Sequence, residues 1–204
     1  DDAIIAAREA LDIAPGHLPA VQRLDELYTI TERWDDLART LEDTIDLVRD
    51  DQERVVVLKI RLAGVFEQYL DDPQRAVEIY AEVLAAEPDN AAAIEALERL
   101  FENDALAPTI APVLQPVYDR RGDWQKLIDV YCVREAASDD VAEKVDWNYK
   151  IAELYELIGG MPENAFGHYE AAAALDPGNE RTLAELLRLA GELDNHGELI
   201  HFLQ

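Results

Sequence analysis

Apolar residues recur at three- and four-residue spacing along nearly the whole chain. Ile60, Ala63 and Phe66 form one such stripe, and Ile151 and Leu154 begin another. This spacing places apolar side chains on one face of an α-helix, whereas a half-buried strand would alternate every second residue. No stretch alternates for long enough to predict a strand, so the pattern predicts an all-α protein.

Proline interrupts the pattern at intervals and divides it into helices. Residues 14–17, 87–90 and 176–179 each contain a proline followed within two residues by Gly or Asn, which ends one helix and begins the next. The connections are short, so consecutive helices are expected to form antiparallel hairpins. About a dozen helices are predicted, at residues 2–14, 18–31, 34–49, 52–70, 73–86, 90–102, 107–120, 123–137, 141–158, 162–175, 179–193 and 196–204.

The chain also repeats itself. When it is shifted by 89 positions, many residues fall on identical ones, as Glu67 does on Glu156 and Arg99 on Arg188. Further matches are Ala63 with Ala152, Ala76 with Ala165, Tyr80 with Tyr169 and Pro88 with Pro177. A long internal period is typical of a solenoid, in which each unit packs mainly on its neighbours. Solenoids present extended surfaces, so binding is the expected class of activity.

Two segments carry a recognisable order of small and aromatic residues. In 148–177, Ala152 and Tyr155 lie on the first helix, Ala165 and Tyr169 on the second, and Pro177 closes the unit. Residues 59–88 repeat this order with Ala63, Phe66, Ala76, Tyr80 and Pro88. The pattern resembles the tetratricopeptide repeat, a helix pair of about 34 residues. In both segments the turn between the helices carries one residue more than the usual pattern.

The resemblance implies one right-handed superhelical solenoid of antiparallel hairpins over residues 1–204. Units 18–49 and 108–137 match the pattern less closely, because each lacks the small residue of the first helix and the closing proline. Pro112 and Pro116 are expected to kink or fray the helix at 107–120. Both ends of the sequence lie within helical patterns, so we interpret the chain as part of a longer array.

The formal net charge is −26. This argues against nucleic acid and anionic membrane surfaces as partners, since both attract clustered Lys and Arg. No apolar run is long enough to insert into a membrane. Two interpretations remain, a basic partner attracted by electrostatic steering and a general surface bias that aids solubility. The composition, rich in Ala, Leu, Asp, Glu and Arg with little Lys, resembles that of GC-rich bacterial genomes.

No motif predicts a catalytic, metal or cofactor site. The single cysteine, Cys132, excludes an internal disulfide and is expected to be a buried small hydrophobe. His196 and His201 are five apart, which is poor spacing for a metal site on one helix face. The acidic turns lack the alternating ligands of a calcium loop. We therefore expect a non-enzyme without a cofactor.

The family resemblance implies that the inward residues of each first helix contact the ligand. By alignment to the pattern, the groove residues are Gln22, Glu26, Ile60, Gly64, Glu67, Gln68, Glu95, Arg99, Tyr149, Glu153 and Glu156. This set lacks the Lys and Asn with which some family members hold a carboxylate. We therefore expect no binding of acidic C-terminal peptides, and an extended segment bearing Lys or Arg fits better, with Ile60 and Tyr149 as apolar anchors. Alternatively, these are solvated residues without a ligand.

The favoured function is a non-catalytic scaffold or adaptor for protein–protein contacts. One alternative is a regulatory or substrate-docking array of a larger multidomain enzyme. Another is self-association through exposed ends, for which the candidate residues are Ile4, Ile5, Leu199, Ile200 and Phe202. The identity of the partner and the location stay open, with the cytoplasm as the preferred expectation.

Overall fold

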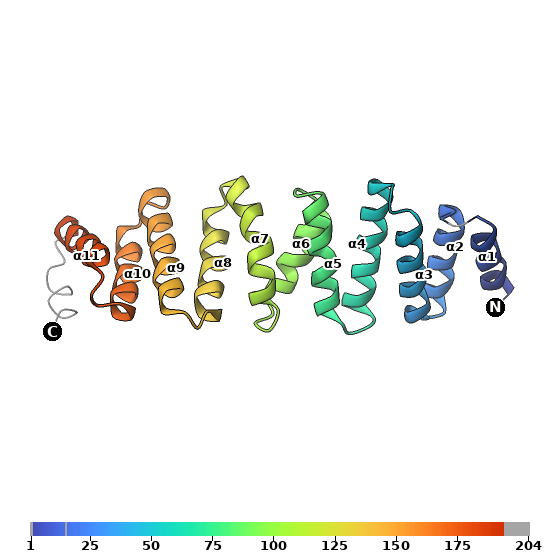
Figure 1. Cartoon of the computed structure of the whole chain (residues 1–204), viewed down its shortest axis with the longest axis horizontal. Helices are drawn as coiled ribbons and strands as arrows, with labels where there is room; N and C mark the ends of the chain where they lie inside the picture. The colour runs from blue at the N-terminus through green and yellow to red at the C-terminus, as the bar shows by residue number, and fades with distance from the viewer. Residues whose placement is uncertain (1, 15, 194–204) are drawn as a thin grey trace. The chain divides into compact units, whose positions relative to one another are not determined.

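The computed structural model describes residues 2–14 and 16–193 (Figure 1). Within these residues lie eleven α-helices, and one of them continues into a π-helical turn. The helices are α1 (Asp2–Ile13), α2 (Leu18–Ile30), α3 (Trp34–Leu47), α4 (Gln52–Gln68), α5 (Pro73–Ala86), α6 (Ala91–Phe101), α7 (Ala107–Arg121), α8 (Trp124–Ala137), α9 (Val141–Glu153), the π-helical η1 (Leu154–Ile158), α10 (Pro162–Leu175) and α11 (Glu180–Glu192). The expected helix at 196–204 lies outside the described residues.

The chain divides into two compact units, Asp1–Leu106 with α1 to α6 and Ala107–Gln204 with α7 to α11. Inside each unit, every helix packs against the helix before it and the helix after it. This confirms the all-α fold of consecutive helix hairpins. The single superhelical array over both units stays a prediction. No helix in the described part of the chain has the length and apolar character that crossing a membrane requires.

Polar caps begin several helices. The side chains of Asp51, Asp72, Asn90 and Asn179 each accept a hydrogen bond from the backbone N–H three residues further on, at 3.0–3.3 Å. Such a bond satisfies one of the free donors in the first turn of a helix. Asn90 and Asn179 are 89 positions apart and cap α6 and α11 in the same way.

The turns inside the hairpins share one backbone feature. Each contains a residue in the left-handed conformation, at Glu32 (φ 54°), Asp71 (φ 52°), Gly122 (φ 69°) and Gly160 (φ 62°). L-residues with a side chain pay a steric cost there, and glycine does not. These positions are acidic residues in the first unit, which incur this cost, and glycines in the second unit, which do not.

The two best repeats have the longer turn that the sequence predicts. The backbone N–H of Asp72 bonds to the carbonyl of Phe66 at 3.1 Å, and that of Met161 bonds to Tyr155 at 2.9 Å, each six residues back. In the other two hairpins the corresponding bond spans five residues. The additional residue is thus accommodated at the end of the first helix, which in the second unit widens into η1.

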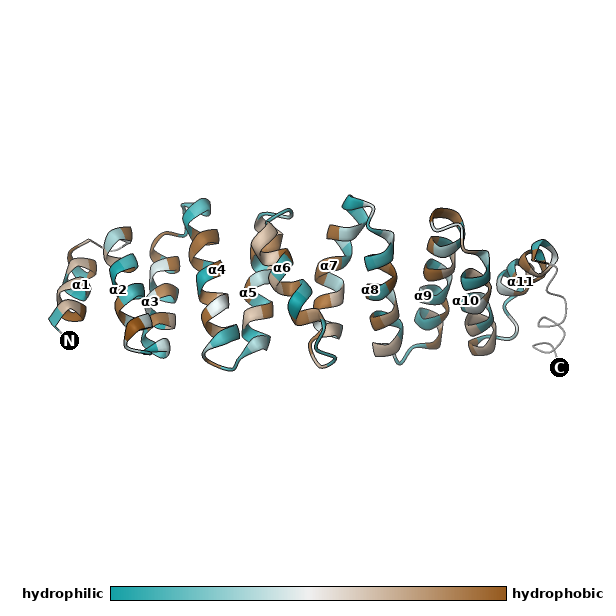
Figure 2. Ribbon diagram, turned by 180° about the vertical axis from the view of Figure 1, so that it is seen from behind, coloured by the Kyte–Doolittle hydropathy of each residue, from teal (hydrophilic) through white to brown (hydrophobic). Residues whose placement is uncertain are grey.

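The small residues of the repeat pattern lie in the core. Ala63, Ala76, Ala152 and Ala165 have no exposed surface, and they lie where α4 meets α5 and where α9 meets α10. Tyr80 and Tyr169 are also buried. Hydrophobic and hydrophilic residues alternate along the helices in the manner of amphipathic helices (Figure 2). The predicted scaffold role of these residues is confirmed.

The prolines of α7 were expected to kink or fray it, and the fraying does not occur. The helix is continuous from Ala107 to Arg121 with Pro112 and Pro116 inside it. Pro108, Pro112 and Pro116 follow at four-residue spacing and are all exposed. The backbone bonds that they eliminate therefore lie on the solvent side, where water can satisfy the freed carbonyls.

Candidate protein-binding surface

The predicted groove residues lie on α2, α4 and α6 of the first unit and on α9 and η1 of the second unit. We call the surface formed by those of the first unit the A-helix face. In the first unit, α2 carries Gln22 and Glu26, α4 carries Ile60, Gly64, Glu67 and Gln68, and α6 carries Glu95 and Arg99. In the second unit, α9 carries Tyr149 and Glu153, and η1 carries Glu156.

Ion pairs connect alternate helices of the first unit across this face. Arg61 on α4 holds Asp25 on α2 through two guanidinium nitrogens, the shortest contact being 2.6 Å. Arg99 on α6 holds Glu67 on α4 at 2.9 Å. Each contact spans the gap between two of these three helices. The helices α2, α4 and α6 therefore present one continuous surface.

Glu67 is the most enclosed carboxylate of the face. Its side chain is 13 % exposed and accepts hydrogen bonds from Arg99 and from the Tyr80 hydroxyl at 3.0 Å. Burial, and then the charge of Glu67, raise the pKa of Tyr80 far above its usual value. The hydrogen bond to Glu67 likewise raises the pKa of Arg99. Glu67 is therefore a structural group that a partner reaches only at its edge.

The second unit contains a corresponding arrangement. Arg188 on α11 pairs with Glu156 at 2.8 Å, and also with Glu185 and Glu192 on its own helix. Hydrogen bonds to these carboxylates raise the pKa of Arg188, the bond to Glu156 most of all. Arg181 pairs with Glu153 at 3.3 Å. The predicted carboxylates of this unit are thus already matched by arginines.

Sequence reasoning missed these arginines as partners of the groove. Arg61, Arg181 and Arg188 were not among the predicted site residues, although they determine its charge. A signal was present in the repeat itself. Glu67 precedes Arg99 by the same 32 residues that separate Glu156 from Arg188. An acid–base pair that recurs at constant separation indicates a contact.

Tyr149 differs from its expected role as an apolar anchor. It is 5 % exposed, with its ring 5.1 Å from that of Tyr169, and the Arg181 guanidinium lies 4.3 Å from the centre of its ring. Burial raises the pKa of its hydroxyl. Its side chain packs inside the second unit, because its position on α9 faces α10.

The face has accessible residues on all three helices, and those on α6 are Glu95 and Arg99. Gln22 and Glu26 line an open depression of about 500 Å³, together with Asp25, Thr29 and Ile30. Ile30 is one of the most exposed large apolar residues. On α4, a side-chain carbon added at Gly64 would meet no atom within 4 Å, so the space in front of it is open.

An exposed apolar segment follows in the second unit. Leu157 and Ile158 of η1 are 75 % and 60 % exposed, and they line a cleft of about 250 Å³ with Tyr131 and Lys150. The Lys150 ammonium lies 3.9 Å from the centre of the Trp147 ring, a cation–π contact. The sequence predicted an ordinary helix through this segment, so these exposed side chains were not expected.

The structure describes some of the residues considered for chemistry. Cys132 is exposed, contrary to the expectation of a buried residue. Desolvation, and then Asp129 and Glu135, raise the pKa of its thiol, which keeps it protonated and poorly nucleophilic. Across residues 2–14 and 16–193, no three His, Cys, Asp or Glu side chains gather closely enough to hold a metal ion. His196 and His201 lie outside the described residues.

Comparison with known proteins gives likenesses of fold at low identity. No family model matches the chain, and no curated protein matches it. A TPR2AB-domain:pHSP90 complex of yeast Sti1 is 14 % identical, with a TM-score of 0.43, and the match covers 98 % of this chain and 80 % of that one. The MamA protein is 15 % identical, with a TM-score of 0.36 and coverage of 87 % and 83 %. The P58(IPK) TPR domain is 17 % identical, with a TM-score of 0.44 and coverage of 98 % and 63 %.

Proposed function

We propose that this chain is a non-catalytic protein-binding segment and that the A-helix face is where a partner docks. The observation that carries this proposal is the continuity of α2, α4 and α6, whose side chains meet across the gaps between the helices. An extended face of this kind suits a segment of another protein better than a small molecule, which prefers an enclosed cavity.

The charges of the A-helix face that no arginine neutralises indicate the chemistry of the partner. Asp25 and Glu67 are neutralised by arginines, so the accessible negative charge of the A-helix face comes from Glu26 and Glu95. Glu26 makes an exposed contact to Arg23 on its own helix. A segment with a basic side chain near Glu26 and an apolar one against Ile30 fits this surface, and its affinity falls as salt screens the charges.

Two synthetic peptides test this proposal, one of alternating lysine and leucine and one of alternating glutamate and leucine. Calorimetry at low and at moderate salt is expected to detect the lysine peptide alone, with weaker binding at the higher salt. Glu26→Gln and Ile30→Ser are each expected to weaken binding several-fold. Glu9→Gln is the matched control, because Glu9 is also exposed and lies on α1, which carries none of the residues of this face. Tighter binding of the glutamate peptide would refute the proposal.

Self-association through α1 is a second candidate, favoured by its exposed isoleucines. Ile5 and Ile13 are 53 % and 85 % exposed, whereas Ile4 is buried inside the unit and cannot contribute. Leu199, Ile200 and Phe202 lie outside the described residues. Light scattering over a dilution series distinguishes the candidates, since Ile13→Asp would dissociate a dimer formed through α1 and leave the peptide affinity unchanged.

A further inference from the structure

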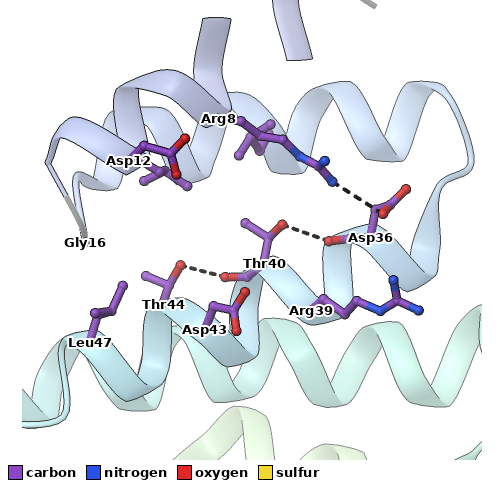
Figure 3. Close-up of a pocket in the computed structure, with 11 residues that line it drawn as sticks. Arg8, Asp12, Gly16, Asp36, Arg39, Thr40, Asp43, Thr44 and Leu47 are labelled. Carbon is purple, nitrogen blue, oxygen red and sulfur yellow. Dashed lines mark hydrogen bonds and ion pairs between the residues drawn. The ribbon is translucent and has the colours of Figure 1, made fainter. Parts of the chain in front are cut away.

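A second cleft lies on the opposite side of α2 from the A-helix face. It has a volume of about 720 Å³ and is bounded by α1, α3 and the turn at Gly16 (Figure 3). Its α2 residue is the buried Leu24, which the helical period places opposite Gln22 and Glu26. The cleft and the A-helix face can therefore be occupied and tested separately.

The cleft contains apolar side chains, and its two ends carry different charges. Leu11 and Leu47 supply its accessible apolar surface, whereas Leu24 has no exposed surface. The arginine side chains end beside Asp36, whereas Asp12 and Asp43 lie toward the other end (Figure 3). This arrangement is not an acidic cluster but a cleft with a basic and an acidic half.

Some charged side chains of the cleft are already bonded to other residues of the protein, and others are not. Arg8 donates to Asp36 at 3.4 Å and to the Tyr28 hydroxyl at 2.7 Å, so both Arg8 and Asp36 are engaged. No ion pair or hydrogen bond holds the side chains of Arg39, Asp12 or Asp43 within residues 2–14 and 16–193. These three side chains are exposed and available to a ligand.

The spacing of the available charges matches an extended peptide. Arg39 and Asp43 are four residues apart on α3, about 6 Å along the helix axis. In an extended chain, residues two apart point to the same side and are separated by about 6–7 Å. Two side chains of opposite charge at positions i and i+2 of a peptide can therefore meet Arg39 and Asp43 together.

We propose that this cleft binds an extended segment of a partner protein that carries a basic and an acidic side chain two residues apart. The basic side chain enters between Asp12 and Asp43, and its aliphatic stem lies against Leu11 and Leu47. The acidic side chain pairs with Arg39. A protein segment fits better than a free zwitterion, because exposed ion pairs contribute little each and the additional contacts of a chain with Leu11 and Leu47 are needed for affinity.

The test uses three blocked hexapeptides with the central sequences Lys-Ala-Glu, Lys-Ala-Gln and Gln-Ala-Glu, titrated into the ¹⁵N-labelled chain. The Lys-Ala-Glu peptide is expected to move backbone amide signals of α1 and α3 and to bind several-fold more tightly than either singly neutral peptide. Arg39→Gln should abolish the preference for Glu over Gln, and Asp43→Asn should weaken the preference for Lys over Gln, because Asp12 remains. Such paired losses are the non-additivity that direct contacts produce.

Asp35→Asn is the matched control, because Asp35 lies exposed on the same helix, makes the same change of charge and does not line the cleft. Glu26→Gln, on the A-helix face, should leave this binding unchanged, so that failure here is distinguishable from failure of the proposed function. Equal affinity for all three peptides, shifts centred on other helices, or equal losses with Asp35→Asn and Asp43→Asn would each overturn the proposal.

Discussion

Two sets of matching residues, 89 positions apart, make different contacts in the two units: Glu67, Tyr80 and Arg99 in the first, and Glu156, Tyr169 and Arg188 in the second. In the first unit the contacts converge on the carboxylate, because Glu67 accepts hydrogen bonds from both Tyr80 and Arg99. In the second unit the arginine is the centre, because Arg188 meets three carboxylates. Among the described residues, no hydrogen bond joins Tyr169 to Glu156.

The local helix geometry explains this difference. Glu67 lies in the regular helix α4, whereas Glu156 lies in the π-helical η1, which is wider and rotates its side chains relative to an α-helix. The wider turn ends at Gly159 and Gly160, where the first unit has Leu70 and Asp71. Identical side chains 89 positions apart therefore build the same helix hairpins in both units. They do not make all of the same hydrogen bonds.

The largest expected effect tests what the two units share. Ala76→Leu and Ala165→Leu should each overpack a hairpin and lower the free energy of unfolding by about 1–3 kcal/mol. Both alanines have no exposed surface. Urea unfolding measures the effect, and Ala174→Leu, at an exposed site on α10, is the control with an expected change within about 0.5 kcal/mol. Retained stability in either core variant would contradict the proposed packing.

The next effect tests how the two units differ. Tyr80→Phe eliminates a hydrogen bond to a charged acceptor and should cost about 1.5 kcal/mol or more. Tyr169→Phe loses no described bond to Glu156 and should change stability by less than about 0.5 kcal/mol. The same urea experiment measures both. Equal losses in the two variants would mean that the tyrosines play the same role and that the contrast between the units is not real.

Substitutions at the left-handed turn residues should change stability by a smaller amount and in opposite directions in the two units. Gly122→Ala and Gly160→Ala should each destabilise by about 1 kcal/mol, because an added side-chain carbon meets no atom and the cost comes from the backbone alone. Glu32→Gly and Asp71→Gly should relieve that cost and stabilise by a few tenths to about 1 kcal/mol. Thermal unfolding of the four variants distinguishes the directions, and any stabilised alanine variant would contradict the assignment.

The smallest expected effect is a loss of stability of the second unit when the pH is lowered. His168 bonds through Nδ1 to Asn148 Oδ1 at 3.0 Å and stacks on Tyr155, and burial lowers its pKa below 6.5, partly offset by Glu135. Between the lowered pKa and 6.5 the unfolded chain binds a proton that the folded chain does not, so stability falls as the pH drops through this window.

In a Trp34→Phe background, fluorescence of Trp124 and Trp147 during urea unfolding, at about pH 7.5 and about pH 5.5, measures this dependence in the second unit. His168→Gln preserves an amide donor for Asn148 but cannot be protonated, so it should lose less stability on acidification than the wild type. An unchanged difference between the two pH values in His168→Gln would show that His168 is not responsible.

The sequence determined the helices well because their ends depend on local chemistry. Proline at residues 73 and 162 and asparagine at 90 and 179 begin helices through backbone effects that need no knowledge of the tertiary fold. The packing of Ala63 and Ala152 followed from the repeat. Contacts such as Arg61 with Asp25, 36 residues apart, depend on how one helix tilts against another, which no local pattern specifies.

The dependence of a contact on the tertiary arrangement also explains two of the wrong expectations. Cys132 was placed in the core because its neighbours are apolar, yet a helix turns 100° per residue and carries this position outward. Pro112 and Pro116 were expected to fray α7, and only the structure shows that both lie on its solvent side. Whether a local irregularity is costly depends on the face that carries it.

The contacts from α2 to α4 and from α4 to α6 also have a mechanical meaning. Each links helices that are next-but-one neighbours, so any motion that spreads the first unit open on this side must stretch the bonds of Arg61 and Arg99. Both pairs are partly exposed, and dissolved ions weaken them. The first unit should therefore behave as a spring that becomes softer as the ionic strength rises, and a single-molecule pulling curve would record that change in compliance.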